Sequence, residues 1–200
     1  MKKIVILISG TGSNMQAIVN ACNNSKLDAK VSAVISNSHK ALGIEWANQN
    51  NISTNIINHK DFETRELFDE ELLKCVQNYN PDIVVLAGFM RILTPVFIQP
   101  LLGKLINIHP SILPKFKGLH THARAIEANE QFHGASVHFV TPELDDGPII
   151  LQFATPIFKN DTEQSLAKRV LSLEHSLYVE AINMLISEQI TFENVSKSQM

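Results

Sequence analysis

The stretch "KIVILISGTGSNMQAIVN", residues 3–20, places an apolar run, a glycine-containing turn and a helix-like segment in direct succession. The run at 3–9 is almost continuously apolar, which is typical of a strand buried on both faces. "SGTGSN" at 9–14 then lets the backbone turn tightly before an amphipathic pattern begins. We therefore predict a strand, a turn and a helix, the first unit of a parallel α/β sheet.

The same alternation of strand-like and helix-like segments continues for the next ninety residues. Continuous apolar strands separated by helices predict a parallel sheet that is covered on both faces and has right-handed crossovers. This is a doubly wound, Rossmann-like α/β architecture. The predicted strands are 3–9, 31–36, 53–58, 82–88 and 104–109.

The pattern changes from about Gly134. Two strand-like runs, 135–140 and 148–157, follow one another through the turn-rich "TPELDDG", which suits neighbouring strands better than a helical crossover. A long helix is predicted from about Thr162 to Glu188, with apolar residues three and four apart on one face. The mostly parallel sheet should thus have a mixed C-terminal part and a long C-terminal helix. The face residues are Leu166, Val170, Leu173, Leu177 and Ala181.

Composition limits the function classes. The 200 residues are 44% hydrophobic and 18% charged, and the formal charge of -3 disfavours a nucleic-acid partner. No apolar run approaches the roughly 20 residues of a membrane span. Cys22 and Cys75 lie in helix-like segments without metal-ligand spacing, so we expect two buried thiols in a reducing compartment. These features lead us to expect a cytoplasmic protein. We expect one domain, since no linker divides the chain.

The glycine turn at 9–14 is a candidate phosphate site. Its glycines and the helix that follows would point backbone N–H groups at an anion. The stretch lacks the Lys-Ser/Thr ending of a Walker A loop and the third glycine of the dinucleotide fingerprint. A plain turn whose helix is capped by Ser13 or Asn14 is the alternative.

Asn107 and His109 end the fifth predicted strand and share one of its faces, because side chains alternate along a strand. An amide donor beside an imidazole can stabilise an oxyanion and move a proton. A carboxylate from "ELDDG", 143–147, could reach them and favour the imidazolium. The alternatives are a strand-end pair satisfied by loop backbone and an acidic surface turn.

Two further polar features are less specific. His120 and His122 join His109, His133 and His138 in one region, but without Cys, a Glu-bearing helix motif or further metal-site pattern, so we expect no metal. Glu174 projects inside the apolar stripe of the long helix, where a carboxylate needs a partner. Ribose hydroxyls, a ligand amine or an intramolecular salt bridge would each serve.

Five motifs, in order, resemble the phosphoribosylglycinamide formyltransferases, a family of purine-biosynthesis enzymes. They are "ISGTGSN", "VVLAGFMRIL", "LINIHPSILPKFKG", "HGASVHFV" and "ELDDGPIILQ", and the resemblance spans about residues 3–188. Asn-x-His followed by Pro-Ser-x-Leu-Pro is shared with the wider formyltransferases that use 10-formyltetrahydrofolate. "SGTGSN" together with "LAGFMRIL" resembles the glycinamide ribonucleotide enzymes in particular.

The resemblance implies the reaction and its catalytic residues. In such enzymes the glycinamide amino group attacks the formyl carbon of 10-formyltetrahydrofolate directly, and a tetrahedral intermediate carries an oxyanion. Asn107 and protonated His109 would stabilise that oxyanion. Asp145, which matches the family position better than Asp146, would keep His109 protonated and help relay the proton, with water as the expected carrier.

The resemblance also implies the binding residues. Gly12, Ser13 and Asn14 would hold the substrate phosphate, and Glu174 the ribose portion. Leu171 departs from the polar residue that family members can carry there, so Lys168 or Arg169 could assist the phosphate loop. Arg65 and Arg91 suit the anionic benzoylglutamate tail of folate. The implied folate-site residues are Arg65, Met90, Arg91, Ile92, Leu93, Asn107, Thr141, Pro142, Glu143, Leu144 and Asp145.

The implied binding residues divide the chain into two halves and indicate its partners. A phosphate-binding half would cover about 1–103, and a catalytic and folate-binding half about 104–190. We expect small-molecule substrates, no nucleic acid, no membrane, and a monomer or weak homodimer. The mostly polar segment 115–125 could be a mobile lid.

Three other functions stay open at this stage. Methionyl-tRNA formyltransferases share the chemistry but add a C-terminal domain, and formyltetrahydrofolate deformylases typically carry a regulatory domain in front of this core. The chain length, the negative charge and the first strand at residue 3 lead us to expect neither. A nucleotide-binding module without catalysis is also disfavoured, because Asn107, His109 and Asp145 are all present.

Overall fold

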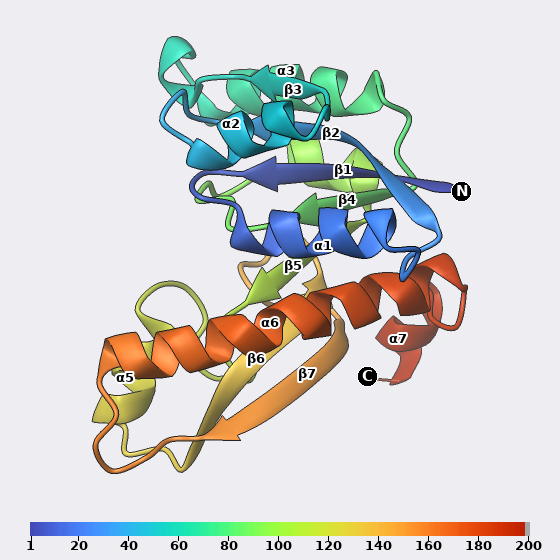
Figure 1. Cartoon of the computed structure of the whole chain (residues 1–200). Helices are drawn as coiled ribbons and strands as arrows, with labels where there is room; N and C mark the ends of the chain where they lie inside the picture. Colours follow the sequence, from blue (N-terminus) through green and yellow to red (C-terminus); the bar gives the residue numbers. More distant parts are fainter. Residues whose placement is uncertain (199–200) are drawn as a thin grey trace.

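A computed structural model of the chain describes residues 1–198 and contains one seven-stranded sheet with helices on both faces (Figure 1). The strand order is β3-β2-β1-β4-β5-β6-β7. The first five strands pair in parallel, whereas β5–β6 and β6–β7 are antiparallel. The predicted mostly parallel sheet with a mixed C-terminal part is therefore confirmed. The strands are β1 (Lys2–Ile8), β2 (Ala29–Ser36), β3 (Thr54–Ile56), β4 (Ile83–Leu86), β5 (Leu105–His109), β6 (Phe132–Phe139) and β7 (Ile149–Pro156).

Helices alternate with strands along most of the chain. The predicted long C-terminal helix is present as α6. Two short helices, α5 and α7, had no counterpart among the predicted elements, and α5 overlaps the segment expected to be a polar lid. The helices are α1 (Ser13–Asn23), α2 (Leu42–Gln49), α3 (Arg65–Gln77), α4 (Pro95–Ile98), α5 (Thr121–Glu127), α6 (Glu163–Ile186) and α7 (Phe192–Ser198), with 3₁₀ turns at His59–Asp61 and Gln99–Leu101.

The alternation of β1 divides the interior into two cores. Ile4, Ile6 and Ile8 face the core that α1, α2 and α6 cover. Val5 and Leu7 face the opposite core, which α3 and α4 cover. All five side chains are fully buried, as expected for a parallel strand with helices on both faces. In Figure 1 α6 runs beside α1 and across β6 and β7, and the two helices pack against each other.

Helix α6 begins with a capping box, in which Thr162 Oγ1 accepts from Ser165 N at 3.2 Å and Ser165 Oγ accepts from Thr162 N at 3.0 Å. The prediction that Leu173 belongs to the buried face is wrong, because its side chain is exposed. The buried stripe is centred on Val170, Glu174 and Ala181, which leaves Leu173 at its edge. Glu174 is buried in that stripe, as the sequence predicts.

The two cysteines are free thiols in α1 and α3, where the sequence places them. The prediction that both are fully buried is wrong, since Cys22 and Cys75 are half-buried. Partial burial still raises the pKa of the Cys22 thiol to about 11, so this thiol stays protonated at neutral pH. Throughout residues 1–198, each helix is too short or too polar to cross a lipid bilayer.

Candidate active site

His109 ends β5 as a buried imidazole between two acceptors. Its Nδ1 lies 3.3 Å from Asp145 Oδ2, and its Nε2 lies 2.9 Å from the Phe116 carbonyl oxygen. A carboxylate and a carbonyl can only accept, so each ring nitrogen of His109 faces an acceptor.

The structure places Asp145, and not Asp146, against His109. Asp145 has a backbone φ of 49° in the β6–β7 connection, and its Oδ2 also accepts from Gly118 N at 2.9 Å. The Asp145 side chain is only 9% exposed. Asp146 points elsewhere and forms an ion pair with Lys117. One of two adjacent carboxylates is thus selected by backbone geometry.

The segment after β5 supplies both backbone partners of this pair, the Phe116 carbonyl and the Gly118 N–H. Its conformation is held by Arg124 of α5, which donates to the Lys117 carbonyl at 2.7 Å and the Leu119 carbonyl at 3.2 Å. Sequence reasoning treated this segment as a lid and missed its direct contacts with the histidine and carboxylate. Backbone contacts leave no residue-type signal by which they could have been found.

The Asn107 side chain contacts His138, which the sequence suggests only as a candidate metal ligand. Its Nδ2 lies 3.3 Å from His138 Nε2, and His138 Nδ1 donates to the Phe139 carbonyl at 2.8 Å. Burial lowers the pKa of His138, so its neutral Nε2 accepts from the Asn107 amide. The pairing follows from the register Asn107↔His138 between β5 and β6. The sequence alone does not specify that register.

A pocket of about 110 Å³ opens beside Asn107, His138 and Asp145. Most of the predicted folate residues line it, and the additional lining residues are apolar apart from His138. Met90 and Arg65 do not line it: the Met90 side chain is 67% exposed, and Arg65 is exposed at the start of α3. The pocket is formed by Leu86, Phe89, Arg91, Ile92, Leu93, Ile98, Asn107, His138, Val140, Thr141, Pro142, Glu143, Leu144 and Asp145.

The predicted phosphate loop forms the start of α1. Gly12 is the N-cap residue with φ of 70°, and no side chain caps the helix. The alternative of a turn capped by Ser13 or Asn14 is therefore not realised, and the first backbone N–H groups of α1 keep no side-chain partner. A Cβ at Gly12 would approach Met15 Cε to 3.0 Å, besides the unfavourable φ.

Asn14 and Glu174 connect this loop to α6. Asn14 Nδ2 donates to Glu174 Oε2 at 2.9 Å, and both side chains are buried. Burial raises the pKa of Glu174, and the Asn14 hydrogen bond partly opposes this. Asn14 Oδ1 is buried without a hydrogen-bond partner among residues 1–198. The intramolecular partner foreseen for Glu174 is thus an amide rather than a cation.

Arg169 of α6 contacts the segment that precedes this helix. Its guanidinium pairs with Asp161, donates to the Pro156 carbonyl at 2.9 Å and lies over the Phe158 ring at 4.7 Å. Lys168 is exposed, and Leu171 is 38% exposed. The suggestion that Arg169 or Lys168 assists the phosphate loop stays a prediction.

Two of the clustered histidines, His122 and His133, contact each other. His133 Nε2 lies 3.0 Å from His122 Nδ1, while His120 is exposed at the start of α5. The part of the chain that the structure describes contains no group of three or more His, Cys, Asp or Glu arranged to hold a metal ion.

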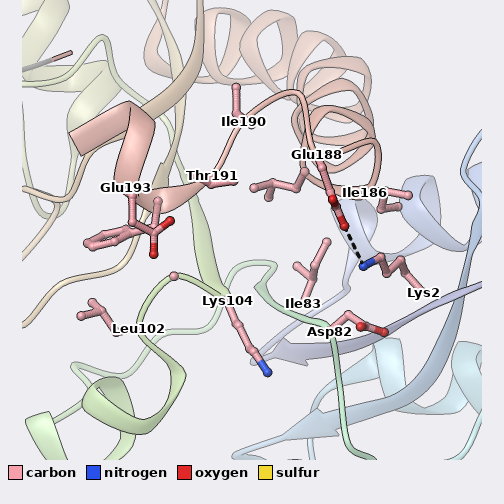
Figure 2. A pocket seen from close by; sticks show the side chains of 13 residues that line it. Lys2, Asp82, Ile83, Leu102, Lys104, Ile186, Glu188, Ile190, Thr191 and Glu193 are labelled. Atoms are coloured by element: carbon pink, nitrogen blue, oxygen red, sulfur yellow. Dashed lines mark hydrogen bonds and ion pairs between the residues drawn. The ribbon is translucent and has the colours of Figure 1, made fainter. Parts of the chain in front are cut away.

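A larger hollow of about 400 Å³ lies near the amino ends of β1, β4 and β5, at the opposite edge of the sheet (Figure 2). It is crossed by an ion pair between Lys2 Nζ and Glu188 Oε1 at 3.5 Å. Lys104 also lines it. None of the predicted site residues is among its lining, so size does not identify the functional pocket.

Comparisons with known proteins agree with this geometry. Residues 2–182 match the family described as Formyl transferase. Phosphoribosylglycinamide formyltransferase of Escherichia coli is 51% identical over 175 residues, which cover 88% of this chain and 82% of that protein. The trifunctional purine biosynthetic protein adenosine-3 of Drosophila melanogaster is 44% identical over 93% of this chain, but the match covers only 14% of that longer protein.

Solved structures show the same fold. The phosphoribosylglycinamide formyltransferase of Coxiella burnetii superposes with a TM-score of 0.91 at 45% identity, over 95% of this chain and 89% of that one. At this identity the likeness extends beyond the fold. The chain belongs to the formyl transferase family.

Proposed function

We propose that this chain is a phosphoribosylglycinamide formyltransferase of de novo purine biosynthesis. It transfers the formyl group of 10-formyltetrahydrofolate to the amino group of glycinamide ribonucleotide and releases tetrahydrofolate. The observation that carries the proposal is the pairing of His109 with Asp145, at 3.3 Å, beside Asn107 and the pocket that the predicted folate residues line. The identity with the Escherichia coli enzyme supports the choice of substrates.

The reaction requires groups that stabilise negative charge on the formyl oxygen. As the amine attacks the formyl carbon, a new C–N bond forms and the carbonyl π electrons move to the oxygen. The Asn107 amide, one of whose N–H groups faces His138, has a second N–H for this oxyanion. The imidazolium of His109 provides the second donor, with Nε2–H exchanging the Phe116 carbonyl for the reacting oxygen.

Collapse of the tetrahedral intermediate breaks the bond to the folate nitrogen. The attacking nitrogen must lose a proton, and the departing nitrogen must gain one. Asp145, beside His109, would accept or return a proton through water. No covalent bond to the protein is needed.

The ribonucleotide would lie along the start of α1. Its phosphate would accept from the backbone N–H groups after Gly12, which no side chain caps. Glu174, with Asn14, would accept from ribose hydroxyls or the glycinamide amine, and such a donor would also satisfy the buried Asn14 Oδ1. The hydrogen-bonded pair Asn14–Glu174 would thus join the phosphate and ribose positions.

The folate would enter the pocket with its bicyclic ring first. At about 110 Å³ the pocket is smaller than the roughly 300–1,000 Å³ of sites that enclose drug-sized ligands, so the benzoylglutamate tail would extend outside. Arg91, which is half-buried at the pocket, and the exposed Arg65 would attract its carboxylates. We also propose a cytoplasmic location, a monomer or weak homodimer, and no nucleic-acid partner.

A spectroscopic assay tests the function. The purified protein is mixed with 10-formyltetrahydrofolate, and loss of the formyl group is followed with and without glycinamide ribonucleotide. Turnover that requires the ribonucleotide is the expected result. Equal loss without it would identify a deformylase, and no loss in either case would leave a binding module.

A further inference from the structure

The loop from Met90 to Thr94, which we call the folate loop, is held at each end by a side chain from another element. At one end, Met90 N donates to Ser9 Oγ at 2.7 Å. At the other end, Thr94 N donates to Asp69 Oδ2 of α3 at 2.6 Å. Both hydrogen bonds are short and fix the position of a backbone N–H. The three residues between them, Arg91 to Leu93, line the pocket.

Ser9 has a second contact that Asp69 lacks. Its hydroxyl donates to Asn37 Oδ1 at 2.6 Å, while the Ser9 backbone N donates to the Gly88 carbonyl at 3.1 Å. Asn37 follows β2 and is buried, and His59 Nδ1 lies 3.0 Å from its carbonyl. The Ser9 hydroxyl therefore uses its single proton for Asn37, after β2, and one lone pair for Met90, after β4. In this way it connects the loops that follow β1, β2 and β4.

The position of Ser9 in the chain makes this contact relevant to both substrates. Ser9 ends the first apolar run and directly precedes the loop from Gly10 to Gly12, which leads into α1. A shift of the Ser9 backbone would therefore move the phosphate loop as well. Loss of the Ser9 hydroxyl would remove the hydrogen bond that holds Met90 N at the start of the folate loop. Asp69, in contrast, contacts only the far end of the folate loop.

We propose that Ser9 is a positioning residue that fixes the phosphate loop and the folate loop relative to each other, so that the affinities for both substrates depend on its hydroxyl. This inference rests on the proposed function. Removal of one such hydroxyl, with one bond to each neighbouring loop, is expected to weaken each substrate by about three- to tenfold. At saturation kcat changes less, because Ser9 does not contact the reacting atoms.

Calorimetry with four variants tests the proposal. The dissociation constants of glycinamide ribonucleotide, and of a folate analogue without a transferable formyl group, are measured separately, together with KM and kcat. Ser9→Ala should weaken both ligands, and Ser9→Thr, which restores the hydroxyl, should return both to within about twofold of the parent. Asp69→Ala should weaken only the folate analogue.

Ser38→Ala is the matched control. The Ser38 hydroxyl lies at the same edge but accepts only from Lys40 N, at 3.1 Å within its own loop, so neither affinity should change by more than about twofold. If Ser9→Ala does not fold, Ser9→Cys, with a weak S–H donor, takes its place. If Ser9→Ala, or Ser9→Cys in its place, folds and weakens one ligand alone or neither, the inference is overturned. Failure of the unmodified protein to bind either ligand would instead overturn the proposed function.

Discussion

At the end of β5, the imidazole of His109 lies between two oxygen acceptors, one from Asp145 and one from the Phe116 backbone. The sequence places Asn107 and His109 on the same face of a strand, and it indicates that "ELDDG" could supply a carboxylate. It does not decide between Asp145 and Asp146. That choice depends on a positive φ at Asp145 and on the Gly118 N–H, both of which arise only when the connection folds over β5.

Replacing each aspartate with asparagine should separate the two carboxylates. Asp145→Asn removes the negative charge beside His109, and we expect kcat to fall by about 10²–10⁴-fold, the range of general acid–base contributions. Asp146→Asn is the matched control, because it removes only a surface ion pair with Lys117. Steady-state kinetics measure both. Similar losses in the two variants would contradict the structural choice of Asp145.

His138 and Ser9 show the limit of residue-level prediction. Both contact residues of the site, through Asn107 and Met90 respectively. Neither belongs to a motif with a recognisable spacing for these roles. Their partners are 31 and 81 residues away in the chain, so only strand register and loop packing bring them together.

At the scale of elements, helix α6 connects the substrate side of the sheet to its centre. Its Tyr178 is fully buried, and the single proton of the hydroxyl is shared between the carbonyl oxygens of Leu86, at 3.0 Å, and Ile106, at 3.2 Å. These carbonyls belong to β4 and β5, and Ile106 directly precedes Asn107. Burial raises the pKa of Tyr178, so the hydroxyl remains a donor.

Removal of this hydroxyl should cost stability. Tyr178→Phe leaves two buried carbonyls without the donor, and we expect the free energy of unfolding in urea to fall by about 1–3 kcal/mol. Tyr79→Phe, which loses only a part-buried bond from Asn55, should cost less. Equal costs for the two tyrosines would show that Tyr178 does not bridge the strands in solution.

Most elements were predicted, including the three-residue β3, but two short helices were not. The strands and α6 have sustained apolar patterns, so their existence and order followed from the sequence. Helices α5 and α7 have seven residues each, too few for a reliable periodic signal or for stability in isolation. They form because the rest of the fold provides contacts, such as those of Arg124 with the loop after β5.

At the scale of the whole molecule, several buried histidines make folding depend on pH. Burial and the neighbouring His122 lower the pKa of His133 from 6.5 to about 4. In the unfolded chain this ring binds a proton near pH 6.5, so its contribution to stability is present above that pH and is lost as pH falls toward 4. Burial also lowers the pKa of His122, His138 and His175, with the same sign, whereas the raised pKa values of Glu174 and Asp69 act oppositely.

A single substitution isolates one of these contributions. Between about pH 7 and pH 5, neutral His133 should account for about 1–2 kcal/mol of the decrease in unfolding free energy. His133→Gln should remove that part of the slope, while His39→Gln, at an exposed position, should not. Urea denaturation at several pH values measures the difference. Parallel slopes for the parent and His133→Gln would contradict the assignment.

In the proposed reaction the formyl group moves directly from the folate to the ribonucleotide, without a stop on the protein. The most direct measurement is a single-turnover experiment with an isotopically labelled formyl group, excess protein and glycinamide ribonucleotide, quenched at successive times. We expect the label to appear in formylglycinamide ribonucleotide as it leaves the folate, with none bound to protein. Label released as formate, or trapped on the protein before product appears, would contradict it.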